Sequence, residues 1–162
     1  SEQPKDTLGI LSRAKHQRLE LLEEWGASLT EGIFPARPRQ WDLNAHRFMD
    51  ATVGIQSVSA RGRALLEAGG VSCQAIGQRL TEHHRWLSEG IEVSTERIDA
   101  LLEQAAQLGA CGGKINGSGG GGTAFAVFPK GKIQPAVEAF HATGTRVIPV
   151  NLGAEGVRIK IN

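Results

Sequence analysis

The amino-acid sequence predicts an α+β fold, in which a helical bundle packs on a four-stranded antiparallel sheet. Between about residues 5 and 109, apolar side chains recur every three to four positions, which is typical of amphipathic helices. After Gly109 the apolar period shortens towards two, which is typical of strands, and one more helical stretch interrupts the strands. Helices followed by a small sheet favour a domain whose sheet covers one face of the helices. At 162 residues, the chain is long enough for one such domain with its own core.

The first helix is expected over residues 5–25, ending near Gly26. Pro35 and Pro38 then make a loop, because proline cannot continue a helix. Asp42 is a suitable N-cap for a long second helix, which Gly69 and the glycine after it terminate. The apolar residues that predict these helices are Leu8, Leu11, Leu19 and Leu22 in the first and Phe48, Val53, Ile55, Val58 and Leu65 in the second.

A third helix is expected over about residues 72–88, with Ile76, Leu80 and Leu87 on one face. A fourth begins after Ser94 or Thr95, because either hydroxyl can cap it and acidic residues in its first turn suit the positive end of the helix dipole. The elements predicted after Gly109 are strands at 114–116 and 123–128, a helix at 134–142, and strands at 146–150 and 157–161.

Composition excludes several classes of partner. Lys plus Arg is 18 and Asp plus Glu is 17, so the formal net charge is +1. This balance creates no general attraction for nucleic acid or for an anionic membrane surface. No apolar run approaches the roughly 20 residues of a membrane span, and no signal segment opens the chain. We therefore expect a cytoplasmic protein that binds small molecules or other proteins, but no nucleic acid and no membrane.

Few side chains point to metal or redox chemistry. Cys73 and Cys111 lie in separate predicted elements without metal-ligand spacing, so we expect reduced thiols that pack in the interior. His83 and His84 are adjacent and cannot form the i, i+4 pair by which helices bind zinc, so no metal site is expected. Scattered tryptophans without interleaved basic residues are expected to pack rather than to stack on bases; they are Trp25, Trp41 and Trp86.

The segment KINGSGGGG, residues 114–122, is unusual because five of its last six residues are glycine. Holding five glycines in defined conformations costs about 2.5–5 kcal/mol relative to alanine, whereas a chain reversal needs only one or two glycines. One interpretation is a structural hairpin tip, since glycine-rich turns are common. The other is a loop whose bare backbone amides, together with the Ser118 hydroxyl, approach a phosphate.

Common nucleotide-binding loops fit this segment poorly. Gly117, Gly119 and Gly122 satisfy G-x-G-x-x-G, but a dinucleotide-binding loop opens a helix, and here a strand is predicted to follow. The Walker loop fails because no Gly-Lys-Ser/Thr follows. A protein-kinase glycine loop does lie between strands, but the chain has neither H-R-D nor D-F-G.

Longer motifs resemble a known superfamily. Residues 94–128, STERIDALLEQAAQLGACGGKINGSGGGGTAFAVF, resemble the third motif region of the galactose, homoserine, mevalonate and phosphomevalonate kinases. Residues 80–94, LTEHHRWLSEGIEVS, are similar to the preceding helix of galactokinases, with His84 at the histidine of their Ser-His pair and His83 in place of the serine. Residues 4–13, PKDTLGILSR, look like the segment by which such kinases cross from the N-terminal to the C-terminal domain.

The resemblance implies a ferredoxin-like C-terminal kinase domain over residues 1–162, with helices at about 5–109 and a sheet subdomain at about 110–162. It implies an ATP-dependent transferase that phosphorylates a sugar hydroxyl, as galactokinases do, or alternatively mevalonate. Lys5 and Thr7 match the mevalonate-kinase pattern Pro-Arg/Lys-x-Thr, so they would neutralise charge and donate a hydrogen bond near the transferring phosphate. The loop expected to face the phosphates comprises Gly117, Ser118, Gly119, Gly120, Gly121 and Gly122.

Two departures from the family pattern limit this expectation. Thr123 stands where many relatives have cysteine, and the main phosphate loop, Pro-x-x-x-Gly-Leu/Ile-Gly/Ser-Ser-Ser, is absent from the chain. ATP and Mg²⁺ would then be bound mainly by an N-terminal domain, in the same or a separate chain, which in many members also supplies the catalytic aspartate. We therefore assign no catalytic residue and expect a C-terminal half that is incomplete and inactive alone. A non-catalytic ligand-sensing or subunit-interaction module of the same fold is the alternative.

Overall fold

The computed structural model describes residues 7–150. Helices α1 (Thr7–Trp25), α2 (Leu43–Glu67), α3 (Cys73–Arg85) and α4 (Glu96–Gln107) come first, and a π-helical turn, η1 (Trp86–Gly90), extends α3. Strands β1 (Gly112–Asn116) and β2 (Thr123–Val127) and helix α5 (Ile133–Ala142) follow. The predicted order of four helices, two strands and a helix is confirmed. No helix among these residues combines the length and apolar character that crossing a membrane requires.

Side-chain caps begin three of the helices. The Asp42 carboxylate accepts a hydrogen bond of 2.8 Å from the Ala45 amide and caps α2, as predicted. Thr95, one of the two predicted candidates, caps α4 by accepting from the Ile98 amide at 3.3 Å. Ser72 caps α3 in the same way. These oxygens satisfy amides of the first helical turn that have no partner within the helix.

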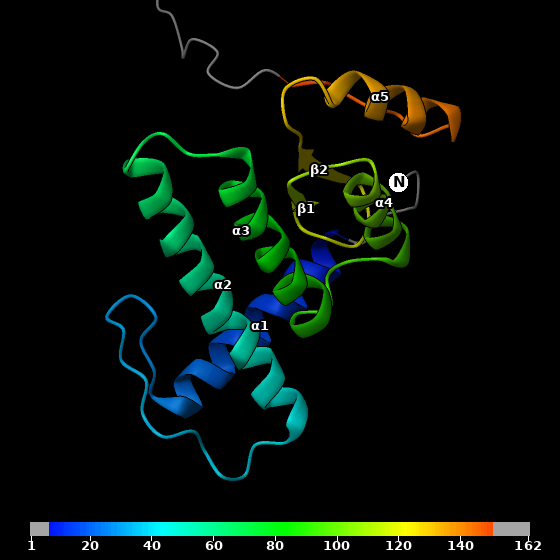
Figure 1. Cartoon of the computed structure of the whole chain (residues 1–162). Coiled ribbons are helices and arrows are strands. Elements are labelled where there is room, and N and C mark those ends of the chain that lie inside the picture. Colours follow the sequence, from blue (N-terminus) through cyan, green and yellow to red (C-terminus); the bar gives the residue numbers. More distant parts are fainter. Residues whose placement is uncertain (1–6, 151–162) are drawn as a thin grey trace, which may run out of the picture.

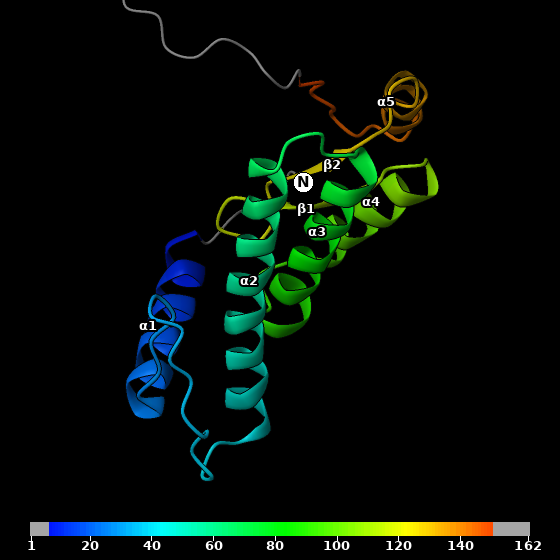
Figure 2. The same cartoon turned by 60° about the vertical axis from the view of Figure 1, so that its left-hand side comes forward.

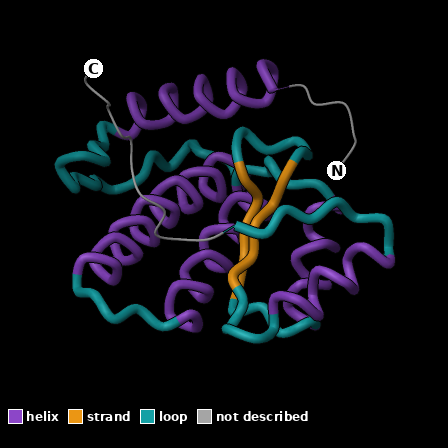
Figure 3. The backbone as a smooth tube through the Cα atoms, turned by 90° about the horizontal axis from the view of Figure 1, so that it is seen from above, coloured by secondary structure: helices purple, strands orange, loops and turns teal. Residues whose placement is uncertain are grey.

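Helix α2 packs against α1 and α3, and the hairpin of β1 and β2 packs against α3 and α4 (Figures 1 and 2). Seen from above, the two strands run between helices on either side (Figure 3). The rings of Trp25 and Trp41 meet edge to face at 5.9 Å, and Trp86 is partly buried against the same core, so the expected packing role is confirmed. This core joins α1, α2 and the segment after η1 and comprises Trp25, Trp41, Phe48, Met49, Ala51, Ile91 and Val93.

The sheet is smaller than the sequence predicts. Within residues 7–150, β1 pairs antiparallel with β2, from Gly112 opposite Val127 to Asn116 opposite Thr123, and no further strand joins them. The prediction of a strand at 146–150 is wrong, because these residues form no regular element. The strand predicted at 157–161 lies outside the described residues. β-branched residues favour a strand only where a neighbouring strand and a packed face are available, so composition alone was insufficient.

Helix α1 buries a different face from the one predicted. Leu8, Leu11 and Leu19 are exposed, although their spacing suggested a core-facing side. Leu22, the fourth of the predicted residues, does pack against the core, together with Ile10, Ala14 and Leu21. Helical periodicity therefore located the helix correctly but identified its buried face only in part.

Cys73 and Cys111 form a disulfide between the start of α3 and the residue before β1, with Cα atoms 5.9 Å apart. The expectation of two reduced thiols is therefore wrong. Gly77, one turn along α3, allows this close approach, because a Cβ at Gly77 would collide with the Cys111 carbonyl. The disulfide thus fixes β1 to α3 near the beginning of the hairpin.

Candidate functional site

The glycine loop (residues 117–122) connects the end of β1 with the start of β2. Its five glycines all have φ in the left-handed region: 80° at 117, 84° at 119, 69° at 120, 108° at 121 and 84° at 122. Glycine alone enters this region without a steric cost. The path of the backbone along the whole loop, rather than chain reversal alone, therefore accounts for the number of glycines.

The loop rests on two supports from distant parts of the chain. The Gly120 amide donates a hydrogen bond of 2.7 Å to the Val93 carbonyl. A Cβ on Gly119 would collide with that same carbonyl, and a Cβ on Gly120 would meet the Ile10 side chain of α1. The loop is therefore a packed element rather than a free hairpin tip, and the Gly120 amide is engaged within the chain.

Ser118 is the one residue of the loop with a side chain, and its Oγ is buried without a hydrogen-bond partner among residues 7–150. A buried hydroxyl without a partner costs about 1–3 kcal/mol. The adjacent Gly117 is exposed. An unsatisfied hydroxyl beside exposed backbone, between residues of positive φ, fits the kind of concavity that binds anions.

The described residues offer different groups to the two implied cofactors, the phosphates of ATP and Mg²⁺. The glycine loop fits a phosphate group, through its backbone and Ser118. The described part of the chain contains no group of three or more His, Cys, Asp or Glu side chains that fits a metal ion. Among the described residues, the chemical features of the glycine loop that suit an anion are its backbone of positive φ and the Ser118 hydroxyl.

The other predicted phosphate-proximal residues lie at the start of the chain. Lys5 is outside the described residues, and Thr7 begins α1. Ile10 follows three positions later in α1, and its side chain lies against Gly120. The first turns of α1 therefore lie beside the glycine loop, while the roles of Lys5 and Thr7 stay predictions.

A hydrogen-bond network around Asp99, next to β1 and the segment between η1 and α4, was not anticipated from the sequence. The Asp99 carboxylate, in the first turn of α4, accepts from His84 Nε2 at 2.9 Å, from Ser94 Oγ at 2.5 Å and from Ser88 Oγ at 3.0 Å. His84 Nδ1 in turn accepts from the Ile115 amide of β1 at 3.3 Å. Partial burial raises the pKa of Asp99, but the hydrogen bonds to its carboxylate, foremost that from Ser94, outweigh burial and lower the pKa below its ordinary value.

A lysine lies at the entry to the loop. Lys114 Nζ donates to the Ile115 carbonyl at 2.8 Å and lies 5.5 Å from the centre of the Phe125 ring. Burial lowers the pKa of this ammonium group. Burial and then the charge of Lys114 lower the pKa of the neighbouring His83, so neither residue occupies an ordinary aqueous environment.

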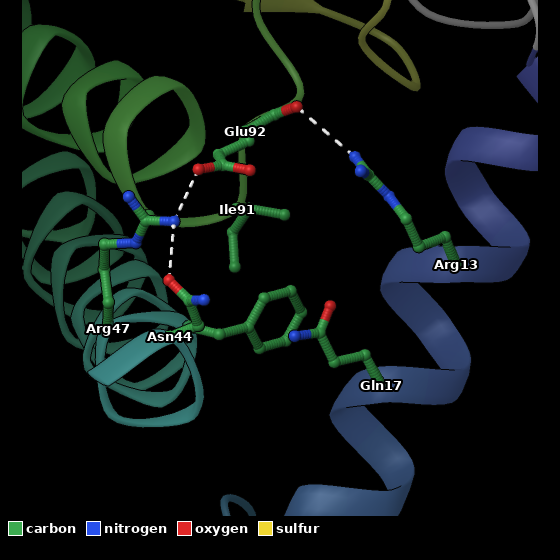
Figure 4. A pocket seen from close by; sticks show the side chains of 8 residues that line it. Arg13, Gln17, Asn44, Arg47, Ile91 and Glu92 are labelled. Atoms are coloured by element: carbon green, nitrogen blue, oxygen red, sulfur yellow. Dashed lines mark hydrogen bonds and ion pairs between the residues drawn. The ribbon is translucent and has the colours of Figure 1, made fainter. Parts of the chain in front are cut away.

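A polar pocket of about 370 Å³ lies between α1, α2 and the strap, by which we mean residues 90–94 (Figure 4). Arg13 donates to the Glu92 carbonyl at 3.4 Å, and Arg47 forms an ion pair with the Glu92 carboxylate at 2.5 Å. Glu92 has a φ of 58°, a strained conformation for a residue with a side chain. Since Glu92 adjoins Val93, the pocket and the glycine loop share the strap.

The sequence is similar to those of known kinases. Residues 71–146 match the sequence family described as GHMP kinases C terminal. The galactokinase of Thermococcus kodakarensis is 37% identical over 144 residues, which are 86% of this chain and 41% of that enzyme. The mevalonate kinase of Thermococcus onnurineus is 35% identical over 82 residues, 51% of this chain and 24% of that enzyme.

A solved structure has the same fold. The crystal structure of L. major mevalonate kinase in complex with R-mevalonate superposes with a TM-score of 0.62 over 86% of this chain and 35% of that one, at 18% identity. The chain spans less than half the length of these relatives. Residues 71–146 therefore carry the C-terminal domain of the GHMP kinases, and the relatives that the chain resembles beyond them are galactokinases and mevalonate kinases.

Proposed function

We propose that this chain is the C-terminal half of an ATP-dependent small-molecule kinase that phosphorylates a sugar hydroxyl, as a galactokinase does. The observation that carries the proposal is the glycine loop, five glycines of positive φ held between the first turns of α1 and Val93. The similarity to a galactokinase extends over 86% of the chain, which supports the sugar as the substrate class.

The loop suits the electrostatic demands of phosphoryl transfer. In such a reaction, negative charge spreads over the equatorial oxygens of the moving phosphoryl group. Donors that are already in position stabilise this charge without reorganising. The exposed backbone at Gly117 and the Ser118 hydroxyl would act as such donors, and the Gly120 hydrogen bond to Val93 would hold them in place. Lys5 and Thr7 would add a positive charge and a further donor.

The remaining parts of the active site would come from an N-terminal domain, in the same chain or in a separate one. This domain would bind most of ATP and Mg²⁺ and supply the catalytic base. The chain spans 41% of the galactokinase that it matches, so we expect no turnover from these 162 residues alone.

Mevalonate is the second candidate substrate. Mevalonate kinases of two Thermococcus species are 33–35% identical over about half of the chain. The segment PKDT, residues 4–7, also follows the mevalonate-kinase pattern. Both substrates present a hydroxyl as the acceptor, so the chemistry assigned to the loop is the same for either.

The test is to produce the chain together with its N-terminal domain and to measure ADP release with galactose, heptose, fucose and mevalonate in turn. Release with one sugar and not with mevalonate would support a galactokinase-like enzyme, and the reverse would support the second candidate. A folded two-domain protein that releases ADP with none of the four would contradict both and favour a ligand-sensing or subunit-interaction module.

A further inference from the structure

We propose that Asp99 is a positioning residue for the glycine loop, because its carboxylate ties together two elements that hold the loop, one at its start and one at its middle. One is the end of β1, from which the loop departs. The other is the strap, on which the loop rests. The functional part of this inference depends on the proposed kinase activity, whereas its structural part does not.

The first connection runs through His84 to β1. Because His84 Nδ1 accepts from the Ile115 amide, its proton lies on Nε2, which donates to the Asp99 carboxylate. The Ile115 amide therefore points away from β2 and is satisfied by an imidazole whose orientation Asp99 holds. Ile115 is only 1% exposed, and two residues separate it from the Ser118 of the loop. A rotation of the His84 ring would break its hydrogen bond with the Ile115 amide, near the end of β1 and just before the loop.

The second connection runs through Ser94 to the strap. Ser94 Oγ donates to the same carboxylate oxygen of Asp99 that His84 contacts. The preceding residue, Val93, supplies the carbonyl that accepts from Gly120 and that limits the space at Gly119. Displacement of Ser94 would therefore shift the surface on which the loop lies.

Asp99 itself is well fixed. It lies in the first turn of α4, where its own amide donates to the Thr95 carbonyl at 2.9 Å and where the helix dipole favours a carboxylate. Its second oxygen accepts from Ser88. A charged acceptor forms stronger hydrogen bonds than a neutral one. A single fixed carboxylate thus orients both His84 and Ser94.

The structural part is tested by amide hydrogen exchange in the two-domain protein carrying Asp99→Asn, which keeps the shape of the side chain. Glu96→Gln is the matched control, because it removes an exposed carboxylate from the same first turn of α4. We expect exchange at the Ile115 and Gly120 amides to rise at least about tenfold in Asp99→Asn relative to the control. Equal exchange in both variants would overturn the inference.

The functional part is tested by kinetics on the same two variants. Loss of loop position should lower kcat about tenfold or more, because small misplacements of groups around the reacting atoms are costly, while KM for the acceptor changes less than about threefold. If exchange rises but kcat and KM match those of Glu96→Gln, the loop is positioned by Asp99 without consequence for turnover, and the functional part is wrong. If the parent protein has no activity, the proposed function fails, and exchange alone decides the inference.

Two milder variants keep the test decisive if Asp99→Asn does not fold. Ser94→Ala and Ser88→Ala each remove one hydrogen bond to Asp99, but only Ser94 adjoins the residue that binds Gly120. Exchange at Gly120 should rise in Ser94→Ala and not in Ser88→Ala. The same small change in both variants would show that the strap does not transmit the contact, and the inference would be overturned.

Discussion

The amide of Gly120 donates a hydrogen bond of 2.7 Å to the carbonyl of Val93, which lies 27 positions earlier in the chain. This contact joins the glycine loop to the strap between η1 and α4. It fixes the position of the loop against Val93, because the same carbonyl leaves no room for a Cβ at the neighbouring Gly119. Substitutions in the loop should therefore fall into two classes. Some disturb its contact with Val93, and the others disturb the side of the loop that is proposed to face the phosphate.

Gly119→Ala should destabilise the fold strongly. Alanine at a φ of 84° is strained by about 1 kcal/mol, and its Cβ would collide with Val93, which adds about 1–3 kcal/mol. Gly109→Ala is the matched control, since Gly109 has a φ of 93° but nothing within 4 Å of the added Cβ. Urea unfolding should show a clearly larger loss for Gly119→Ala. Equal losses of stability in the two variants would mean that Val93 and the loop move apart easily to make room for the added Cβ.

Ser118→Ala should separate function from stability. The hydroxyl is buried without a partner in the described part of the chain, so its removal should leave the free energy of unfolding unchanged or slightly raised. If the hydroxyl donates to a phosphate oxygen during the reaction, kcat/KM should fall about tenfold or more, because hydrogen bonds to charged groups are worth about 1.5–3 kcal/mol. Unfolding and ADP-release assays on the two-domain protein measure both. Loss of stability with full turnover would indicate a purely structural serine.

Reduction of the disulfide should destabilise the domain. Cys73 and Cys111 are 38 positions apart, and closing a loop of that size stabilises a fold by about 3–4 kcal/mol. Unfolding should therefore occur at lower urea concentration with reductant than without it. The double variant Cys73→Ala, Cys111→Ala should not respond to reductant. Titration of two free thiols in the unreduced, denatured protein would contradict the pairing.

Stability should fall in mildly acidic solution because of His83. Burial and the charge of Lys114 lower the pKa of His83 from its ordinary value of 6.5, so the unfolded chain binds the proton more readily than the folded one. The free energy of unfolding should therefore fall as the pH drops through 6.5 towards the lowered folded-state pKa. His83→Gln should remove most of this slope, and His141→Gln, at an exposed position, should not. An unchanged slope in His83→Gln would assign the effect to other groups.

The loop could be identified from its sequence, but its surroundings could not. Five glycines within residues 117–122 are a local feature of the sequence, and glycine permits the positive φ values that all five adopt. Asp99 was expected as an acidic residue that suits a helix N-terminus and as part of the motif that resembles the kinases, but not as a partner of His84. Its contact with His84 joins residues 15 positions apart, and the contact of His84 with Ile115 spans 31. No local pattern in the sequence encodes such pairs.

The elements of this protein were decided mainly by short-range interactions, and its sequence was therefore sufficient to predict them. Helix positions and the Asp42 cap depend on residues within a few positions of one another, and the hairpin joins two strands that are adjacent in the sequence. Tertiary packing alone decided which face of α1 is buried, that Cys73 pairs with Cys111, and that residues 146–150 form no strand. Each of these depends on which distant segment is available as a neighbour, and that is settled only when the helices and the hairpin pack together.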